Sequence, residues 1–400
     1  MTHKTLVILT HVVHDAITLG FVPAAKRLDC YIVILTDQPL EHQQFYATGN
    51  DQYLPDQIIS CDVFNGLAVI ETLLQHNIRP DAVFSNSDHL QTQTSQAAQF
   101  FSVPGKDWAT CYRCKNKSAM RTHLQHQNLP SAWHHSLQSN TELQHLTVSF
   151  PCVVKPQEGV ASIDVKLCND FTELEQFCLH FWHNQPGQKI IIEEYLQGPL
   201  FTLETLGDGN NLLVAGGYET QVSAPPYFIE LECVWNNDID SDYMRQAFAQ
   251  IKAFGIGFGA CHSEFVLTED GPRLVEINYR SIGDGCEFLL DRLAPFNWFE
   301  TIISLYLGQP LELQEPIQGC ALTRFFIADR SGELKRVPEN FERHEPHYIR
   351  LQNLKASGEQ HTLSNSNKDY LAVLSAVGDN KASLMENVNT ISSQLIWEIA

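Results

Sequence analysis

The chain has 400 residues, of which 44% are hydrophobic and 18% are charged. This composition excludes wholesale disorder, and no apolar run approaches the roughly 20 residues of a membrane-spanning helix. A formal net charge of −21 argues against nucleic acid or an anionic membrane surface as the main partner. The eleven cysteines are an odd number scattered along the chain, so we expect reduced thiols in a cytoplasmic protein and no disulfide framework.

The first hundred residues alternate short apolar strands with helical segments, which predicts an open α/β domain with a parallel sheet. The run at residues 6–9 predicts a buried strand and not a signal peptide, because no small-residue cleavage site follows it. No GxGxxG follows this strand, so a nicotinamide cofactor is not expected. The polar run Asn86-Ser87-Asp88 follows a strand end and is a candidate for ligand contact. Strands are predicted over residues 5–9, 31–35, 57–59 and 81–85, and helices over 22–28, 66–77 and 92–101.

The rest of the chain predicts a small α+β unit, a larger antiparallel region and a β-rich module that begins near residue 318. The strands are expected over residues 149–156, 161–168, 189–196 and within 202–232, and the helices over 117–127, 171–182, 240–254 and 297–308. We expect four domains, which are an N-terminal α/β domain (1–110), a small lid with a linker helix (111–200), a larger subdomain (201–315) and a C-terminal α+β domain (316–400).

Two strand-like runs around a Glu-Asp-Gly turn carry the most informative polar residues of the chain. An antiparallel hairpin centred on Asp270 places Glu264 opposite Glu276 and His262 opposite Asn278, and side chains of one parity share a face. A solvated surface hairpin is the alternative interpretation. Apolar residues around the polar set favour a largely buried sheet instead, and these are Phe265, Val266, Leu274, Val275 and Ile277.

Like charges that face each other destabilise a sheet unless a cation lies between them. Two carboxylates and a carboxamide are oxygen ligands, which suit Mg²⁺ or Mn²⁺ better than zinc. We therefore predict a divalent metal site formed by Glu264, Glu276 and Asn278. Arg280 has the same parity and is placed to stabilise negative charge on a transferred group.

Two lysines predict a phosphate site. Lys155 ends an apolar strand and enters a loop of mostly small residues, whose amides can donate hydrogen bonds to a polyphosphate. Lys117 begins a predicted helix and is a candidate second cation. The apolar strand that runs into Glu193 can hold a purine between apolar side chains. Cys111 and Cys114 form a CxxC without a second pair, so ordinary thiols are favoured over a metal or redox role.

Taken in order, these segments resemble the ATP-grasp superfamily, and in particular its carboxylate-amine ligases of the L-amino acid ligase and carnosine synthase-like branch. The segments that carry the resemblance are Asn116-Lys117, VVKP with Lys155, IIEEYLQG with Glu193, GACHSEF with Glu264, and GPRLVEINYR with Glu276, Asn278 and Arg280. The flanking parts are similar to the family's N-terminal α/β domain and C-terminal small domain. The resemblance therefore implies the ATP-grasp fold for the chain.

The resemblance also implies an ATP-dependent ligase that joins a small-molecule carboxylate to an amine through an acyl phosphate, as in dipeptide, antibiotic or siderophore assembly. ATP, two Mg²⁺ ions and a homodimer are implied with it. Nucleotide contacts are implied for Lys117, Lys155, Ser162, Glu193, Tyr195, Leu196 and Glu204. Metal contacts are implied for Glu264, Glu276 and Asn278, substrate contacts for Glu230, His262, Arg280, Ser281 and Gly283, and catalytic roles for Lys155 and Arg280.

The chain departs from the family's pattern at four positions. Ala161 and Asp164 stand where the phosphate loop usually has glycines. Leu200 stands where a ribose-binding glutamate is usual, which makes Glu204 the candidate replacement. Cys233 stands where a histidine of the amino-acid pocket is expected. Two alternatives remain, which are a nucleotide-binding protein without catalysis and a carboxylase-type enzyme, although no biotin-carrier motif is found.

Overall fold

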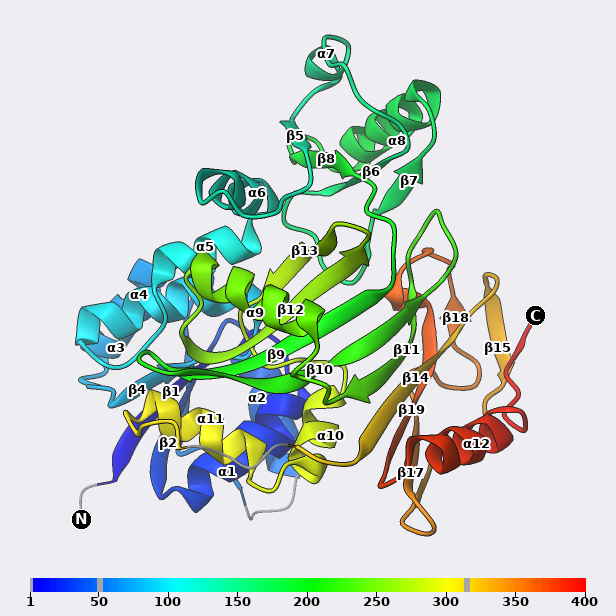
Figure 1. The fold of residues 1–400 in the computed structure, drawn as a ribbon. Coiled ribbons are helices and arrows are strands. Elements are labelled where there is room, and N and C mark those ends of the chain that lie inside the picture. The colour runs from blue at the N-terminus through cyan, green and yellow to red at the C-terminus, as the bar shows by residue number, and fades with distance from the viewer. Residues whose placement is uncertain (1–2, 49–52, 313–316) are drawn as a thin grey trace.

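The computed structural model describes residues 3–48, 53–312 and 317–400, and the strands of this part form four sheets (Figure 1). The N-terminal sheet is parallel, in the order β3-β2-β1-β4, as the alternating pattern predicted. Its strands are β1 (Lys4–Leu9), β2 (Cys30–Thr36), β3 (Gln57–Ser60) and β4 (Ala82–Phe84). The strands are apolar on both faces because helices cover both sides of the sheet.

The three helices predicted for this domain lie close to their expected positions, as α1 (Val22–Arg27), α3 (Gly66–Gln75) and α4 (Gln91–Phe101). The π-helical turn η1 (Ala16–Phe21) and the short turn η2 (Asp88–Leu90) were not predicted, and neither was helix α2 (Pro39–Thr48). Only His42 and Tyr46 are buried along it, so it has no continuous apolar stripe that a sequence pattern could reveal.

The lid is a four-stranded antiparallel sheet in the order β5-β8-β6-β7. Its elements are β5 (His134–Leu137), α7 (Asn140–Leu143), β6 (Cys152–Pro156), β7 (Lys166–Cys168), α8 (Phe171–Asn184) and β8 (Ile190–Glu194), and α5 (Trp108–Lys115) and α6 (Lys117–His126) precede them. The predicted strand at 161–168 is wrong over its first half. Ala161, Ser162 and Asp164 have φ of 56°, 53° and 55°, which a strand does not accept.

A nine-stranded antiparallel sheet forms the centre of the molecule, in the order β13-β12-β9-β10-β11-β14-β19-β17-β16. Its strands are β9 (Leu200–Asp208), β10 (Leu212–Val222), β11 (Glu230–Asn236), β12 (Phe258–Thr268), β13 (Gly271–Asn278), β14 (Cys320–Ile327), β16 (Phe341–Arg343), β17 (Tyr348–Asn353) and β19 (Tyr370–Gly378). The strands after residue 318 thus extend the sheet that carries the predicted hairpin.

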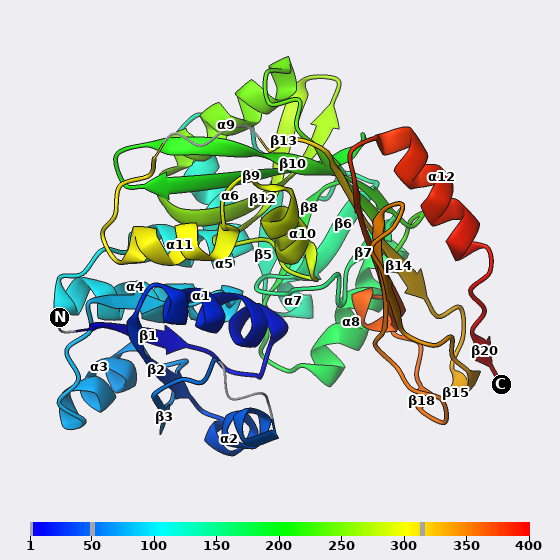
Figure 2. The ribbon, with the colours of Figure 1, turned by 90° about the horizontal axis from the view of Figure 1, so that it is seen from below.

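The remaining elements complete the core and the C-terminal end. They are α9 (Asp242–Phe254), α10 (Cys286–Leu293), α11 (Trp298–Tyr306), β15 (Gly332–Arg336), β18 (Gln360–His361), the turn η3 (Asn367–Asp369), α12 (Lys381–Ser392) and β20 (Glu398–Ile399). In Figure 1 the lid stands above the long sheet and the C-terminal strands continue that sheet on one side. Figure 2 shows α10 and α11 between the N-terminal part and the long sheet, where they join the largest hydrophobic core.

No helix within residues 3–48, 53–312 and 317–400 is both long and apolar enough to cross a membrane. All eleven cysteines are buried and free, and Cys111 and Cys114 lie in the apolar core beneath the predicted hairpin.

We expect these thiols to resist alkylation in the native state. Burial raises the pKa of Cys30 to about 11 and that of Cys152 to about 12, so the reactive thiolate is scarce at pH 8. Mass spectrometry after brief iodoacetamide treatment at pH 8 should therefore find little modification before unfolding and eleven modified cysteines after it in guanidinium. Rapid labelling of several cysteines in the folded protein would contradict this burial.

Candidate active site

The hairpin of β12 and β13 has the predicted register at its functional end. Glu264 pairs with Glu276 and His262 pairs with Asn278. Near the turn, Thr268 pairs with Gly271, so the turn between the two strands is one residue shorter than the turn of a hairpin centred on Asp270. A register shift between Glu264 and Phe265 absorbs the difference. The bulge therefore keeps both carboxylates level with each other.

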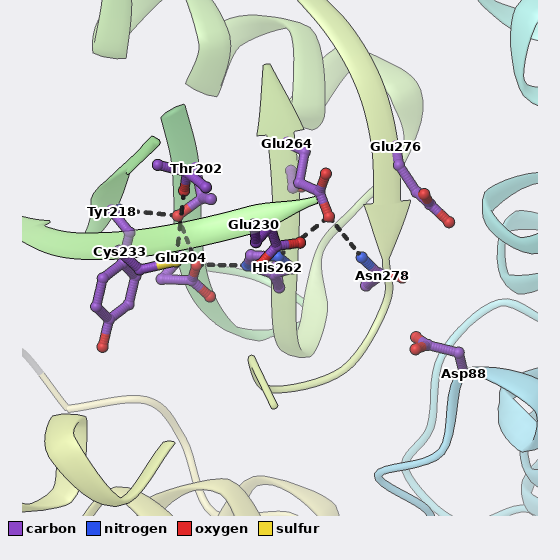
Figure 3. Close-up of polar contacts among 12 residues, drawn as sticks. Asp88, Thr202, Glu204, Tyr218, Glu230, Cys233, His262, Glu264, Glu276 and Asn278 are labelled. Carbon is purple, nitrogen blue, oxygen red and sulfur yellow. Dashed lines mark hydrogen bonds and ion pairs between the residues drawn. The ribbon is translucent and has the colours of Figure 1, made fainter. Parts of the chain in front are cut away.

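A chain of polar contacts holds Glu264 in place (Figure 3). Asn278 Nδ2 lies 3.2 Å and His262 Nε2 lies 3.5 Å from Glu264 Oε1. His262 Nδ1 lies 2.6 Å from Glu204 Oε1 on the neighbouring strand β9. Burial opposes the charge on His262, but the Glu204 carboxylate raises the pKa of His262 to about 10. Burial would likewise raise the pKa of Glu264, but the adjacent His262 holds it below its usual range.

Glu276 faces Glu264 across the hairpin and forms an ion pair with the first residue of α6. Lys117 Nζ donates to Glu276 Oε1 at 2.9 Å and to the carbonyl oxygen of Gly159 at 3.0 Å. Lys117 begins α6 and Gly159 belongs to the loop between β6 and β7, which we call the phosphate loop (residues 157–165). The predicted phosphate lysine is thus in contact with a predicted metal ligand and with the predicted phosphate loop.

Lys155 lies in a buried cluster of charges formed by the lid strands β6 and β8 and helix α6. Its Nζ is 2.6 Å from Glu193 Oε2, and Arg121 Nε donates to Glu193 Oε1 at 2.7 Å. Burial alone would raise the pKa of Glu193, but the two cations lower it to about 2. Arg121 also donates to the carbonyl oxygens of Leu274 and Val275 in β13, which ties the lid to the hairpin. Sequence reasoning missed Arg121, although its position four residues after Lys117 places both on one face of α6.

One cavity lies between the lid and the hairpin, and we call it the nucleotide-side cavity. Both lysines, the phosphate loop, Tyr195 and Leu196 line it together with the hairpin acids. The residues of the prediction that line it are Lys117, Lys155, Ser162, Glu193, Tyr195, Leu196, Glu230, Glu264 and Glu276. Glu204 is absent from this wall, since it is 1% exposed and paired with His262. Glu194 lines the cavity and was not predicted.

Three non-glycine residues of the phosphate loop take the backbone conformation that glycine favours. Ala161, Ser162 and Asp164 have φ of 56°, 53° and 55°, and two of them, Ala161 and Asp164, stand where the family usually has glycines. Asp164 accepts a hydrogen bond from Gln185 Nε2 at 2.9 Å. Asp164 is not among the residues that line the nucleotide-side cavity, so its carboxylate is directed away from the place of the phosphates.

We expect Ala161→Gly to stabilise the protein by about 0.5–1 kcal/mol. The left-handed conformation costs a non-glycine residue about 1–2 kcal/mol, and the larger backbone entropy of glycine in the unfolded chain offsets about half of that. Val160 on the same loop is not among the positive-φ residues, so Val160→Gly serves as the control and should lower the free energy of unfolding. Urea unfolding measures both changes, and equal losses in the two variants would contradict the observed loop conformation.

A second cavity adjoins the first along the hairpin and is called the substrate-side cavity. Arg280, Asp88 and Gly283 line it, together with Cys233 and Phe325. Glu230, Glu264 and Glu276 line both cavities, as does the phosphate loop through Val160, Ala161 and Ser162. The remaining predicted residues that line it are His262 and Asn278.

Arg280 is anchored by the N-terminal part of the chain. Its Nε and Nη2 donate to Asp88 Oδ2 at 2.9 and 2.7 Å, and Asn86 Oδ1 accepts the Ser281 amide at 3.1 Å. The loop after β4, a candidate from the sequence, therefore positions the arginine. Ser281 itself lies outside both cavities, because its hydroxyl accepts a hydrogen bond from Trp298 Nε1 at 2.9 Å.

Glu230 begins β11 and lines both cavities. Removal from water, and then the nearby Glu264 and Asp284 carboxylates, raise the pKa of Glu230 to about 8. Asn367 Nδ2 lies 3.5 Å from Glu230 Oε1, and no cation within the described ranges forms an ion pair with this carboxylate. An ammonium group is the natural partner for such a carboxylate.

The hairpin fits a hard divalent cation. Glu264 and Glu276 are opposite each other, line the same two cavities and offer carboxylate oxygens, and Asn278 adds an amide oxygen. No group of three or more His, Cys, Asp or Glu side chains in the described parts of the chain could hold a metal ion alone. This donor set suits Mg²⁺, which usually keeps waters and substrate phosphates among its ligands.

Comparisons with known proteins agree with this geometry. The model of the ATP-grasp domain matches residues 148–288. The uncharacterized protein y4rH of Sinorhizobium fredii is 27% identical over 332 residues, which cover 80% of this chain and 67% of that protein. Carnosine synthase 1 of Gallus gallus is 26% identical over 240 residues, which cover 54% of this chain but only 26% of the synthase.

The solved structure of the L-amino acid ligase from Bacillus licheniformis superimposes with a TM-score of 0.78. The match covers 100% of this chain and 99% of that chain at 19% sequence identity, which establishes a shared fold. The chain therefore contains an ATP-grasp domain, which the family model matches over residues 148–288, and it shares its overall fold with that ligase structure.

Proposed function

We propose that the chain is an ATP-dependent carboxylate-amine ligase of the amino-acid-ligase type. The γ-phosphoryl group of ATP passes to a carboxylate oxygen, which gives an acyl phosphate and ADP. An amine then attacks the acyl carbon, the phosphate leaves, and the amine nitrogen loses a proton as the amide forms. The single observation that carries this proposal is the shared wall of the two cavities, because the hairpin acids face both the lysines and Arg280.

The nucleotide-side cavity supplies positive charge where phosphates would lie. Lys117 and Lys155 form ion pairs with Glu276 and Glu193. Their ammonium groups are therefore already held in the cavity and need little reorientation when a phosphate binds. Tyr195 and Leu196 follow strand β8 on the same wall, where apolar side chains and backbone groups suit a purine. Glu193 acts in this account by orienting Lys155 and Arg121.

The hairpin would hold the metal. Glu264, Glu276 and Asn278 are the residues placed to bind Mg²⁺, and we assign two ions to this site together with the nucleotide phosphates. When bound, Mg²⁺ supplies neutralisation of the phosphate charge that otherwise repels an incoming carboxylate. The His262 and Asn278 contacts hold Glu264 in one orientation, which lowers the cost of ordering it.

The substrate-side cavity provides the groups that act on the acyl centre. Arg280 is held by Asp88 and by the Ser281 carbonyl oxygen, so its remaining N–H groups can face a developing negative charge without reorganising. Gly283 lines the wall beside it, where the backbone can approach a carboxylate closely. An amino-acid ammonium beside Glu230 would favour the charged form of this carboxyl group, which burial and the neighbouring carboxylates otherwise disfavour.

Phosphate release from ATP tests this proposal. Purified protein with Mg²⁺ is given a panel of amino acids and hydroxy acids, singly and in pairs with a second amine. Release that needs both a carboxylate and an amine supports a ligase. Tight MgADP binding with no release under any pairing would instead indicate a nucleotide-binding protein without catalysis, and release that depends on bicarbonate would indicate a carboxylase-type enzyme.

A further inference from the structure

One residue of the C-terminal region contacts both the phosphate loop and the substrate-side cavity. Asn367 begins η3 and is 9% exposed. Its backbone N–H donates to the carbonyl oxygen of Ala161 at 3.2 Å. Its side-chain Oδ1 accepts the Glu230 amide at 3.3 Å, and its Nδ2 lies 3.5 Å from Glu230 Oε1.

The turn that carries Asn367 is a rigid support. Ser366 and Asp369 form a reciprocal capping box around η3. Asp369 is fully buried and also accepts hydrogen bonds from the Ser364 amide and hydroxyl, both at 2.9 Å. His361 Nε2 lies 3.2 Å from the same carboxylate. Such a network fixes the direction of the Asn367 amide, so whatever binds Asn367 is held in a defined place.

The phosphate loop holds Glu230 by a second route. Ser162 Oγ donates to the carbonyl oxygen of Phe228 at 3.2 Å, two residues before Glu230. The Leu167 amide, just past the loop, donates to the carbonyl oxygen of Pro226 at 3.0 Å. The phosphate loop therefore contacts the segment before Glu230 through Ser162, and it contacts Asn367, the side-chain partner of Glu230, through Ala161.

We propose that Asn367 is a positioning residue that couples closure of the phosphate loop to the orientation of Glu230. Nucleotide that orders the loop would also order Glu230, and a substrate ammonium on Glu230 would in turn favour the closed loop, since coupling between two sites is reciprocal. This inference rests on the proposed function for the roles of the two cavities. Asn367 lies outside the part of the chain that the domain model matches.

Hydrogen exchange with MgADP as the probe tests the coupling without a known substrate. In the wild-type chain, MgADP should slow amide exchange in the phosphate loop and, about 5-fold or more, in residues 227–232. Asn367→Ala should keep the slowing in the loop and weaken it in 227–232, where the Ser162 contact with the Phe228 carbonyl oxygen remains. Lys368→Ala, on the exposed side of the same turn, is the control and should behave as wild type.

Asn367→Pro extends the test to the backbone contact. Proline is accepted at the first position of a helical turn, and Ser366 has φ −144° and ψ 179°, which a residue before proline tolerates. This variant lacks the N–H that reaches Ala161, so the MgADP-dependent slowing should fall in the loop as well. Asn367→Ser, too short to reach Glu230, replaces the alanine variant if that variant does not fold.

The outcomes separate this inference from the proposed function. Absence of any MgADP effect on the loop would overturn the nucleotide role of the lid itself. Slowing in the loop without slowing in 227–232 of the wild type, or full slowing there in Asn367→Ala, would overturn the coupling alone. A merely structural role would speed exchange equally with and without MgADP and leave the MgADP-dependent difference unchanged.

Discussion

Glu276→Gln should reduce substrate-dependent phosphate release by about 10²–10³-fold while the protein stays folded. The substitution removes one carboxylate charge from the hairpin at constant side-chain size. Glu276 is the partner of Lys117 and faces Glu264 across the hairpin, so the variant weakens both the metal site and the placement of a phosphate lysine. Initial rates at several Mg²⁺ concentrations, with the substrate pair found by the panel, give the result.

Glu269→Gln is the matched control for that variant. Glu269 lies exposed at the turn of the same hairpin, so the substitution makes the same chemical change far from both cavities. Its rate should remain within about 2-fold of wild type, because isolated surface substitutions change free energies by about 0.5 kcal/mol or less. A Glu276→Gln variant as active as this control would show that the hairpin is not the metal site.

Glu193→Gln should destabilise the protein by about 3–5 kcal/mol, which is the cost of leaving buried cations without their counter-charge. Glu193 lies between Lys155 and Arg121, and the three side chains are 4%, 9% and 1% exposed. Glu194→Gln is the control, since Glu194 is only half-buried and accepts one long hydrogen bond from the Trp133 amide. Urea unfolding at pH 7 should show a loss of about 1 kcal/mol or less in the control.

The difference in the free energy of unfolding between wild type and Glu193→Gln should depend on pH in a definite direction. The folded-state pKa of Glu193 is about 2 and the ordinary value is 4.5, so its charge stabilises the folded state above pH 4.5 and loses that effect as the pH falls toward 2. The gap of roughly 3 kcal/mol between wild type and Glu193→Gln should therefore narrow below pH 4.5. A gap that stays constant from pH 7 to pH 3 would contradict the ion-pair account.

Local patterns were enough to predict the hairpin. Alternating side chains and a short turn determine which residues face each other, so Glu264, Glu276, His262 and Asn278 could be paired from the sequence. The bulge beside Phe265 could not be foreseen, yet it leaves the functional pairs unchanged. The roles of these residues stay predictions until the variants are measured.

Contacts between residues far apart in the chain could not be predicted from the sequence. Glu204 was assigned to ribose because strand order was unknown, and in the structure β9 lies beside β12, which sets Glu204 against His262. Asn367 approaches Glu230 from 137 residues away, and no pattern marks such a contact. The positive φ of Ala161 shows the same limit, because the backbone conformation comes from the loop's contacts and not from the residue's own preference.

Oxygen transfer is the most direct measurement of the central claim. A carboxylate substrate labelled with ¹⁸O in both carboxyl oxygens is incubated with ATP, Mg²⁺ and the amine, and the released phosphate is analysed by mass spectrometry. Amide formation through an acyl phosphate predicts one ¹⁸O atom in the phosphate for each amide formed. Amide formation with unlabelled phosphate, or release of phosphate with no amide, would contradict the proposed carboxylate-amine ligase.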